Sequence, residues 1–516
     1  MGSRSSRRPG RSPSPAVSCE RTWSDDERPD VAIAPFALCV SVPLRFAFHG
    51  YQQCGIVVRL CSLASSVEFL YISGMSAYLQ CIEENCQKKI APTTKAHVCP
   101  DCSGLLDVMY DFQITDPEKI KQTFQQRRLS NDPLDLSGVW RYRELLPFCS
   151  DPAKVVTMQE GNTPIYEAPH CAEYTGLKKL HLKHQGLNPT GSFKDNGMTA
   201  GVTQARLMHS RMVACASTGN TSASMAAYAA RAGMRAVIFI PDQQIAFGKL
   251  SQSLDYGALT LQLEGDFDEA MKMVKEITEE SEVYLLNSIN PFRLEGQKTI
   301  IIEMLAQRGW KIPDRVVVPG GNLGNSSSFG KAIKELHDLG FIDKMPMVTI
   351  IQALRANPLY KTLIDRSARL IRVEAHTLAT AIKIGNPVSW KKAMRAMEWT
   401  RGWCDVVSEQ EIADAKAMIG RDGVGCEPAS ATTVAGIKKL IQTKEIDKDE
   451  DVVAVLTGNL LKDPDYTVNY HQNNLYEKAA YKNELIERKD KIRSTYANAP
   501  LKVKARKAEI LKVLGL

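Results

Sequence analysis

The sequence predicts an α/β fold in which helices cover parallel sheets. From residue 155 to about residue 465, short apolar runs of strand length alternate with helix-length segments of 3.6-residue periodicity, such as 267–279 and 293–307. Polar loops containing glycine follow several of these runs. The predicted strands are 179–183, 212–216, 236–240, 259–263, 283–287, 315–318, 348–352 and 452–456. In such folds ligands bind beyond the carboxyl ends of the strands, so the loops there are the place to look for chemistry.

The composition is that of a globular protein with two or three domains. The chain has 516 residues, of which 44% are hydrophobic and 24% are charged. Most of the net charge of +7 comes from the basic tail after residue 476, which favours a solvated charged helix over a nucleic-acid-binding arm. No apolar run reaches the roughly 20 residues that span a bilayer, so we expect no membrane segment.

The first 74 residues do not resemble part of a packed domain. Residues 1–19 are rich in Arg and Ser and lack acidic residues, as in an organelle transit peptide, but an acidic cluster at 25–27 argues against that. A non-native extension preceding Met75 is an equal alternative. The thirteen cysteines include no disulfide framework, which indicates a reducing compartment. We therefore expect a cytoplasmic protein, or a plastid or other organellar one if residues 1–74 are a transit peptide.

Four cysteines form two close pairs within residues 75–110. Two pairs of thiolates on tight turns, about a dozen residues apart, are typical of a zinc ribbon, which holds a structural ion in a closed tetrahedron of sulfurs. The alternative is four free thiols in a reduced protein. The predicted zinc ligands are Cys81, Cys86, Cys99 and Cys102.

A lysine stands in the turn 188–195, between a predicted strand and a predicted helix that begins at Asn196. A buried lysine at such a position loses its charge and attacks a carbonyl as a neutral amine. Taken alone, Lys194 would more often be an ordinary surface residue beside a Gly-Ser turn.

Two further loops carry hydroxyl, amide and guanidinium groups at helix starts. Residues 216–222 follow the strand 212–216, and residues 287–298 follow the strand 283–287. Such groups suit a carboxylate or phosphate, although a polar helix cap explains either loop equally well.

The loop 319–325 is glycine-rich, follows an apolar strand and opens a helix, so its backbone N–H groups can hold a phosphate. It lacks the Gly-Lys-Ser/Thr of a P-loop and the spacing of a dinucleotide fingerprint, which favours a phosphate-bearing cofactor. Thr457 follows the strand 452–456 and could bond a heteroaromatic nitrogen.

Together these loops resemble the threonine synthase family, within the fold type II group of pyridoxal-phosphate enzymes. The resemblance covers residues 78–465. It implies two parallel-sheet αβα domains, a large one (111–185 with 289–465) and a small intercalated one (186–288). The tail 466–516 falls outside the resemblance, and we expect it to be basic and helical from its own composition. It also implies a homodimer that converts O-phospho-L-homoserine and water to L-threonine and phosphate, the last step of threonine biosynthesis.

The resemblance implies a role for each matching residue. Lys194 would bind the cofactor covalently and then act as the base at Cα. Asn220 would bind the 3′-oxygen, and Thr457 would meet the pyridine nitrogen and leave it uncharged. The phosphate would be held by Gly321, Asn322, Leu323, Gly324 and Asn325. The substrate would be held by Ser217, Thr218, Thr221, Asn287, Ser288 and Arg293. Residues 426–430 also match the family, but we assign them no catalytic role.

One departure and two alternatives bear on this expectation. Leu460 replaces a glycine that is usual in the family after Thr457. Another fold type II enzyme, such as a cysteate synthase or a threonine/serine dehydratase, is the nearest alternative. A nucleic-acid-binding module built on the cysteine segment and the basic tail is an alternative of a different class.

Overall fold

The computed structural model describes residues 77–241, 247–264, 273–274, 276–277, 282–475 and 492–516. The chain divides into two units, 1–64 and 65–516, and the first unit lies wholly outside the described residues. The expected transit peptide or extension at 1–74 therefore also lies outside them.

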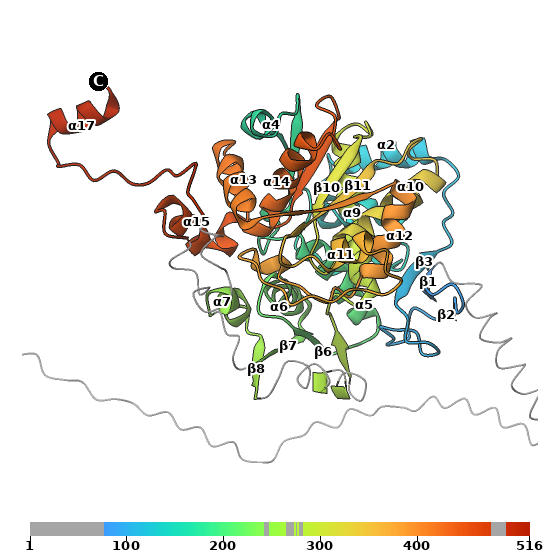
Figure 1. The fold of residues 1–516 in the computed structure, drawn as a ribbon. Coiled ribbons are helices and arrows are strands. Elements are labelled where there is room, and N and C mark those ends of the chain that lie inside the picture. Colours follow the sequence, from blue (N-terminus) through green and yellow to red (C-terminus); the bar gives the residue numbers. More distant parts are fainter. Residues whose placement is uncertain (1–76, 242–246, 265–272, 275, 278–281, 476–491) are drawn as a thin grey trace, which may run out of the picture. The chain divides into compact units, whose positions relative to one another are not determined.

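A six-stranded sheet forms the centre of this unit (Figure 1). Neighbouring strands are parallel, except that β4 runs antiparallel to β5 at one edge. In spatial order the strands are β12 (Trp403–Val407), β11 (Met347–Ala353), β10 (Arg315–Pro319), β13 (Val452–Leu456), β5 (Leu180–His184) and β4 (Ile165–Glu167).

Helices cover both faces of this sheet. In β10 the side chains of Val316 and Val318 pack with α9 (Pro291–Gln307) and α10 (Gly324–Asp338), whereas Val317 packs with α14 (Pro428–Gln442) on the other side. Burial on both faces explains the continuous apolar runs of the central strands. Because these strands are parallel, the loops at their carboxyl ends lie at one edge of the sheet.

A second, four-stranded parallel sheet lies within residues 212–285. The chain leaves the large sheet after β5 and returns to it at β10, so this sheet is an insertion. Its strands, in spatial order, are β8 (Leu259–Leu263), β7 (Arg235–Pro241), β6 (Met212–Ala216) and β9 (Val283–Leu285). Two of its helices, α5 (Lys194–Leu207) and α6 (Asn220–Ala232), begin at predicted site residues. The domain boundaries given above stay a prediction.

The cysteine segment forms a small antiparallel sheet of β1 (Ala77–Cys81), β2 (Lys89–Ile90) and β3 (Leu106–Tyr110). It is attached to α12 (Trp390–Thr400) by Asp107, which pairs with Lys392 and Arg395. In Figure 1 this sheet lies beside α10 and α12.

The predicted strands agree with the structure within two residues, and β6, β8 and β13 agree at both ends. β12 was missed because Asp405 interrupts the short run Trp403–Val407, which is an edge strand with two partly exposed positions.

Helix α5 starts at Lys194 rather than at Asn196. Most of the helix predicted at 267–279 lies outside the described residues. Helix α17 (Lys507–Leu514) in the tail buries no residue, as expected for a solvated helix. Among the described helices, none is long and apolar enough to cross a membrane.

Candidate active site

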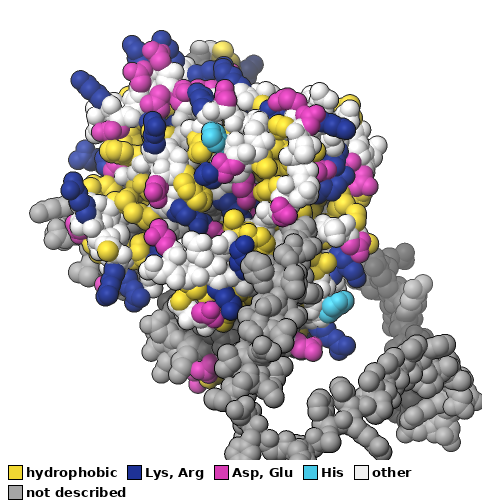
Figure 2. Space-filling model, turned by 90° about the vertical axis from the view of Figure 1, so that its right-hand side faces the viewer, with side chains coloured by type: hydrophobic (Ala, Val, Ile, Leu, Met, Phe, Trp, Pro, Cys, Tyr) yellow, Lys and Arg dark blue, Asp and Glu magenta, His cyan; other side chains and the backbone are white. Residues whose placement is uncertain are grey.

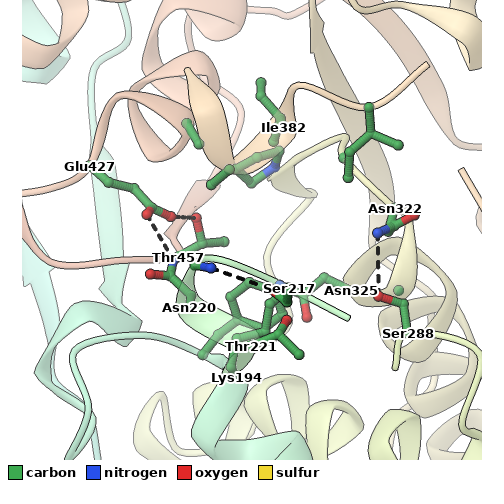
Figure 3. A pocket seen from close by; sticks show the side chains of 18 of the residues that line it. Lys194, Ser217, Asn220, Thr221, Ser288, Asn322, Asn325, Ile382, Glu427 and Thr457 are labelled. Atoms are coloured by element: carbon green, nitrogen blue, oxygen red, sulfur yellow. Dashed lines mark hydrogen bonds between the residues drawn. The ribbon is translucent and has the colours of Figure 1, made fainter. Parts of the chain in front are cut away.

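One cavity of about 260 Å³ gathers loops from both parallel sheets (Figure 3). These loops follow β5, β10 and β13 of the large sheet and β6 and β9 of the small one. The lining includes every predicted cofactor and substrate residue except Asn287: Lys194, Ser217, Thr218, Asn220, Thr221, Ser288, Arg293, Gly321, Asn322, Leu323, Gly324, Asn325 and Thr457.

Lys194 is the first residue of α5 and lines the cavity. Burial and the cationic Arg293 lower the pKa of its amine to about 7, against the opposing influence of Glu427. A lysine with this pKa is neutral for much of the time near pH 7, so it can act as a nucleophile or take up a proton. The structure thus does not support the ordinary-surface-residue interpretation.

The loop after β10 forms a cup around the N-terminus of α10. Leu323 adopts the left-handed conformation (φ 64°), and α10 begins at the next residue. Both amide atoms of Asn325 and the hydroxyl of Ser326 are buried without a hydrogen-bond partner among the described residues. Buried polar groups are normally paired, so these atoms indicate a missing polar ligand. At a helix N-terminus a phosphate fits this description.

Arg293 and Ser288 are further side chains of the cavity wall that can bind an anion. Arg293 is buried and donates from Nη1 to Leu286 O at 2.9 Å, but its Nε has no partner within the described part of the chain. Burial lowers the pKa of Arg293 to about 10, which still leaves it charged at neutral pH. In the same cavity wall Asn322 Nδ2 donates to Ser288 Oγ at 3.3 Å, and this bond joins the loops after β10 and β9 (Figure 3).

Asn287 has a different position from that expected. Its Oδ1 accepts a hydrogen bond of 3.0 Å from Ala216 N, and its Nδ2 donates to Ala216 O at 3.5 Å. It therefore fixes the end of β6, directly before Ser217, and does not line the cavity. Its contribution to the site is to hold the loop that carries Ser217, Thr218, Asn220 and Thr221.

Sequence reasoning gave no role to Glu427, yet its buried carboxylate lies in the cavity wall. One oxygen accepts from Asn220 Nδ2 at 2.9 Å, and the other accepts from Thr457 Oγ1 at 3.1 Å (Figure 3). Gly458 permits this approach, because a Cβ there would lie 2.4 Å from the Glu427 carboxyl carbon. One feature of the sequence could have drawn attention to Glu427: it is a charged residue directly before Pro428, where a buried helix begins.

Comparison with known proteins identifies the family. The family model described as "Pyridoxal-phosphate dependent enzyme" matches residues 156–458. The threonine synthase of Methanocaldococcus jannaschii is 46% identical over 370 residues, which are 71% of this chain and 89% of the relative. That of Methanosarcina acetivorans is 43% identical over 396 residues, or 76% of this chain and 94% of the relative. The chain belongs to the threonine synthase family. It is a pyridoxal-phosphate-dependent lyase, as the loop motifs predicted.

Solved structures agree with this family at the level of fold. Threonine deaminase isoform 2 of Solanum lycopersicum superposes with a TM-score of 0.51 at 18% identity, over 67% of this chain and 85% of that one. A fungal L-serine ammonia-lyase from Rhizomucor miehei gives the same TM-score at 18% identity, over 58% of this chain and 94% of that one. The predicted fold class is thereby confirmed.

The cavity fits pyridoxal phosphate on the chemistry of its donors. A neutral amine (Lys194) suits the aldehyde carbon, and the unpaired amide of Asn325 suits the phosphate. Asn220 follows a strand of the small sheet and Thr457 a strand of the large one, and both side chains bond to Glu427 in the cavity wall.

Proposed function

We propose that this threonine synthase family member converts O-phospho-L-homoserine and water to L-threonine and phosphate. One observation supports this substrate: the cavity wall holds a buried arginine in addition to the glycine-rich loop. The N-terminus of α10 with Asn325 suits the cofactor phosphate. Arg293, whose Nε has no partner among the described residues, suits with Ser288 a second anion carried by the substrate.

Bound pyridoxal phosphate supplies the electron sink for the pair left when a Cα–H bond of the substrate breaks. The protein's own residues bind the substrate, orient it and move protons. We propose that Lys194, neutral near pH 7, takes the proton from Cα and later returns it. Arg293 and Ser288 hold the substrate phosphate, which leaves from Cγ after Cβ has also lost a proton. A proton then adds to Cγ and hydroxide from water adds to Cβ, which gives the threonine side chain. The small polar groups of Ser217, Thr218 and Thr221 hold the carboxylate, so that Cα faces the amine.

We assign the remaining lining residues to the cofactor. Asn220 binds the 3′-oxygen, and Thr457 meets the pyridine nitrogen. The phosphate is held by Gly321, Asn322, Leu323, Gly324 and Asn325.

Phosphate release with O-phospho-L-homoserine and with O-phospho-L-serine tests the proposal, with identification of the amino-acid product. We expect L-threonine and phosphate from phosphohomoserine and little phosphate from phosphoserine. Faster release from phosphoserine would instead indicate a cysteate synthase. Deamination of unphosphorylated threonine or serine would indicate a dehydratase, which has no use for a second anion site.

We propose in addition that the four cysteines hold a structural zinc ion. Cys81 Sγ lies 3.5 Å from Cys102 Sγ, Cys86 Sγ lies 3.6 Å from Cys99 Sγ, and all four sulfurs lie within 4.8 Å of one another. Zn–S bonds of about 2.3 Å in a tetrahedron place sulfurs about 3.8 Å apart, close to these distances. A Cβ at Gly104 would lie 3.0 Å from Cys81 Sγ and 3.2 Å from Cys102 Sγ, so glycine keeps the cluster compact.

The nucleic-acid alternative receives no support from this segment. On the face drawn in Figure 2, Lys and Arg side chains are interspersed with Asp and Glu. Two basic residues near the cysteines pair with acids: Lys391 lies 2.6 Å from Glu83, and Lys88 lies 3.6 Å from Asp101. Paired cations release few counterions when they meet a phosphate backbone.

The proposals on assembly and compartment rest on the sequence and the family resemblance alone. We propose a homodimer, which sedimentation of the full chain tests. We propose a cytoplasmic location, or an organellar one if residues 1–74 are a transit peptide, which mass spectrometry of the natural N-terminus tests.

A further inference from the structure

A second cavity, of about 640 Å³, is lined by residues of α13 (Glu409–Arg421) and α15 (Pro464–His471). Its volume is within the range of about 300–1,000 Å³ that small-molecule sites occupy. It shares no described lining residue with the active-site cavity. The described part of its wall contains three basic side chains, Lys416, Arg421 and His471, and no Asp or Glu.

Lys416 is a buried cation without a counterion. Only 8% of the residue is exposed, and its Nζ donates to Thr467 Oγ1 at 2.8 Å. An ammonium group has three protons to donate, and no carboxylate of the described chain forms an ion pair with this one. Buried charges in proteins are normally paired, because an uncompensated charge loses its hydration. Lys416 therefore has donor capacity left for an anion.

The neighbouring acidic groups do not neutralise this charge. Asp414, on the same helix, accepts a hydrogen bond of 2.9 Å from Tyr470 Oη. Burial raises the pKa of the Cys426 thiol to about 12, so this thiol is uncharged at neutral pH. Burial also lowers the pKa of Lys416, and Asp463 opposes this only in part. A bound anion would supply the missing negative charge.

His471 adds an uncharged donor to the same cavity. Its Nδ1 accepts a hydrogen bond of 2.9 Å from Asn498 N, so the proton of the neutral ring is on Nε2. Burial and the cationic Lys416 lower the pKa of His471, which favours this neutral form. No described residue accepts from Nε2. This N–H can therefore donate to a ligand oxygen.

Arg421 brings a second cation to the cavity wall. Its side chain is exposed, and its guanidinium lies over the Tyr496 ring, with 5.2 Å between Cζ and the ring centroid. Two cations match the charge of about −2 that a phosphate monoester carries at neutral pH. A single carboxylate would balance only one of them. The apolar side chains of Val424 and Leu460 also line the cavity and can contact an organic group.

We propose that this cavity binds a phosphate group, either as inorganic phosphate or as the phosphate monoester of a small organic molecule. The site lies outside the proposed active site and does not depend on it. The two cavities are nevertheless neighbours in the chain, because Cys426 directly precedes Glu427. Leu460 stands where the family usually has a glycine, so this part of the wall is a property of this chain.

Isothermal titration calorimetry of the full-length, cofactor-loaded protein tests this proposal, with phenyl phosphate and inorganic phosphate as probes. K416M should weaken one binding event by about 10-fold or more, as expected when a hydrogen bond to a charged group is lost. S288A changes the proposed active site, which can also bind phosphate, and should leave that event unaltered. K438M is the matched control, since Lys438 lies over the Tyr174 ring and outside both cavities.

Tighter binding of phenyl phosphate than of inorganic phosphate assigns the site to an organic phosphate. Equal or weaker binding of phenyl phosphate assigns it to inorganic phosphate, and either result supports the proposal. The proposal is overturned if no binding event is weakened by K416M and retained by K438M. Benzoate that binds this site as tightly as phenyl phosphate also overturns it, because a carboxylate would then suffice.

A second variant covers the case in which K416M does not fold. H471F removes the Nε2 donor and should weaken the same binding event by at least about 3-fold. An unchanged event in H471F would then overturn the proposal.

Discussion

Asp107 Oδ1 lies 2.7 Å from Lys392 Nζ, and this ion pair joins the cysteine segment to helix α12. The pair is nearly inaccessible to solvent, with 9% and 3% of the two side chains exposed. Lys392 also donates to Leu106 O at 2.6 Å. The helix begins beside the phosphate cup, since Ser389 N donates to Asn322 O at 3.2 Å. The cysteine segment is far from the cavity residues in sequence, and these contacts connect it to the cavity wall.

Substitution D107A should lower the free energy of unfolding by about 3–5 kcal/mol, because it leaves a buried cation unpaired. Urea denaturation of the cofactor-free protein measures this. The matched control is K391A, which removes the exposed Lys391–Glu83 pair of the same interface and should cost less than about 1 kcal/mol. Equal losses for the two variants would contradict the assignment of a buried, structural pair.

The Asp107 contribution should also depend on pH. Burial alone would raise the pKa of this carboxyl, but Lys392, Arg395 and Lys331 hold it below its usual range. A depressed pKa stabilises the fold above the unfolded value of 3.8, and this stabilisation is lost as the pH falls below that value. Wild type and D107A should therefore converge in stability on acidification. A difference that persists unchanged in acid would contradict this origin.

Substitution K194A should abolish both turnover and the visible absorbance of the lysine-bound cofactor, because no other amine is proposed to reach the aldehyde. Absorbance spectra of the reconstituted protein and the phosphate-release assay measure the two effects. An unchanged spectrum would refute the assignment of Lys194.

The rate at which the cofactor-free protein captures pyridoxal phosphate should rise with pH up to about 7 and level off above it. The reactive form is the neutral amine, and the pKa of Lys194 is lowered to about 7. R293M removes the nearby cation and should raise this pKa, which moves the plateau to higher pH. Stopped-flow absorbance measures both profiles. A rate that keeps rising toward pH 10 in the wild type would indicate an ordinary lysine.

The lowered pKa of Lys194 also predicts that the free energy of unfolding depends on pH. Between pH 7 and 10.5 the unfolded chain binds more protons at this residue than the folded chain does. The free energy of unfolding should therefore rise with pH over this window in the cofactor-free protein, and less so in K194M. Parallel curves for the two proteins would contradict the lowered pKa.

Substitution N325A should weaken cofactor binding, because the unpaired amide of Asn325 is proposed to bond the phosphate. A hydrogen bond to a charged group is worth about 1.5–3 kcal/mol, or roughly 10- to 150-fold in the dissociation constant. The control is S328A on the same helix, whose hydroxyl donates to Asn325 O at 3.0 Å and does not line the cavity. Fluorescence titration of the cofactor-free proteins separates the two; equal affinities would contradict the role of Asn325.

The purified full-length protein should contain about one zinc ion per chain, and C99S should lose it. Elemental analysis by mass spectrometry measures this, with C149S as a control because Cys149 is a buried thiol outside the cluster. Metal-free wild-type protein that resists added zinc would contradict the proposed site.

The sequence by itself determined the order of strands and helices along the chain. It also determined which loops carry the residues of the site. Apolar strands such as Val452–Leu456 and the glycines of 319–325 are local signals, because burial on both faces and tight turns constrain residue type directly. The same reasoning identified three site residues, Lys194, Asn325 and Thr457, because each follows a strand that the sequence predicts.

The tertiary structure alone decided what those residues touch. Asn287 turned to the backbone of Ala216, and Glu427 came to lie between Asn220 and Thr457, which are 207 and 30 residues away in the chain. Hydrogen bonds between such distant residues depend on how two sheets pack, and no local pattern encodes that packing. Thr457 is the clearest case. Its hydroxyl oxygen lies 3.0 Å from Ser430 Oγ and 3.1 Å from Glu427 Oε1, and only the folded chain brings these three side chains together.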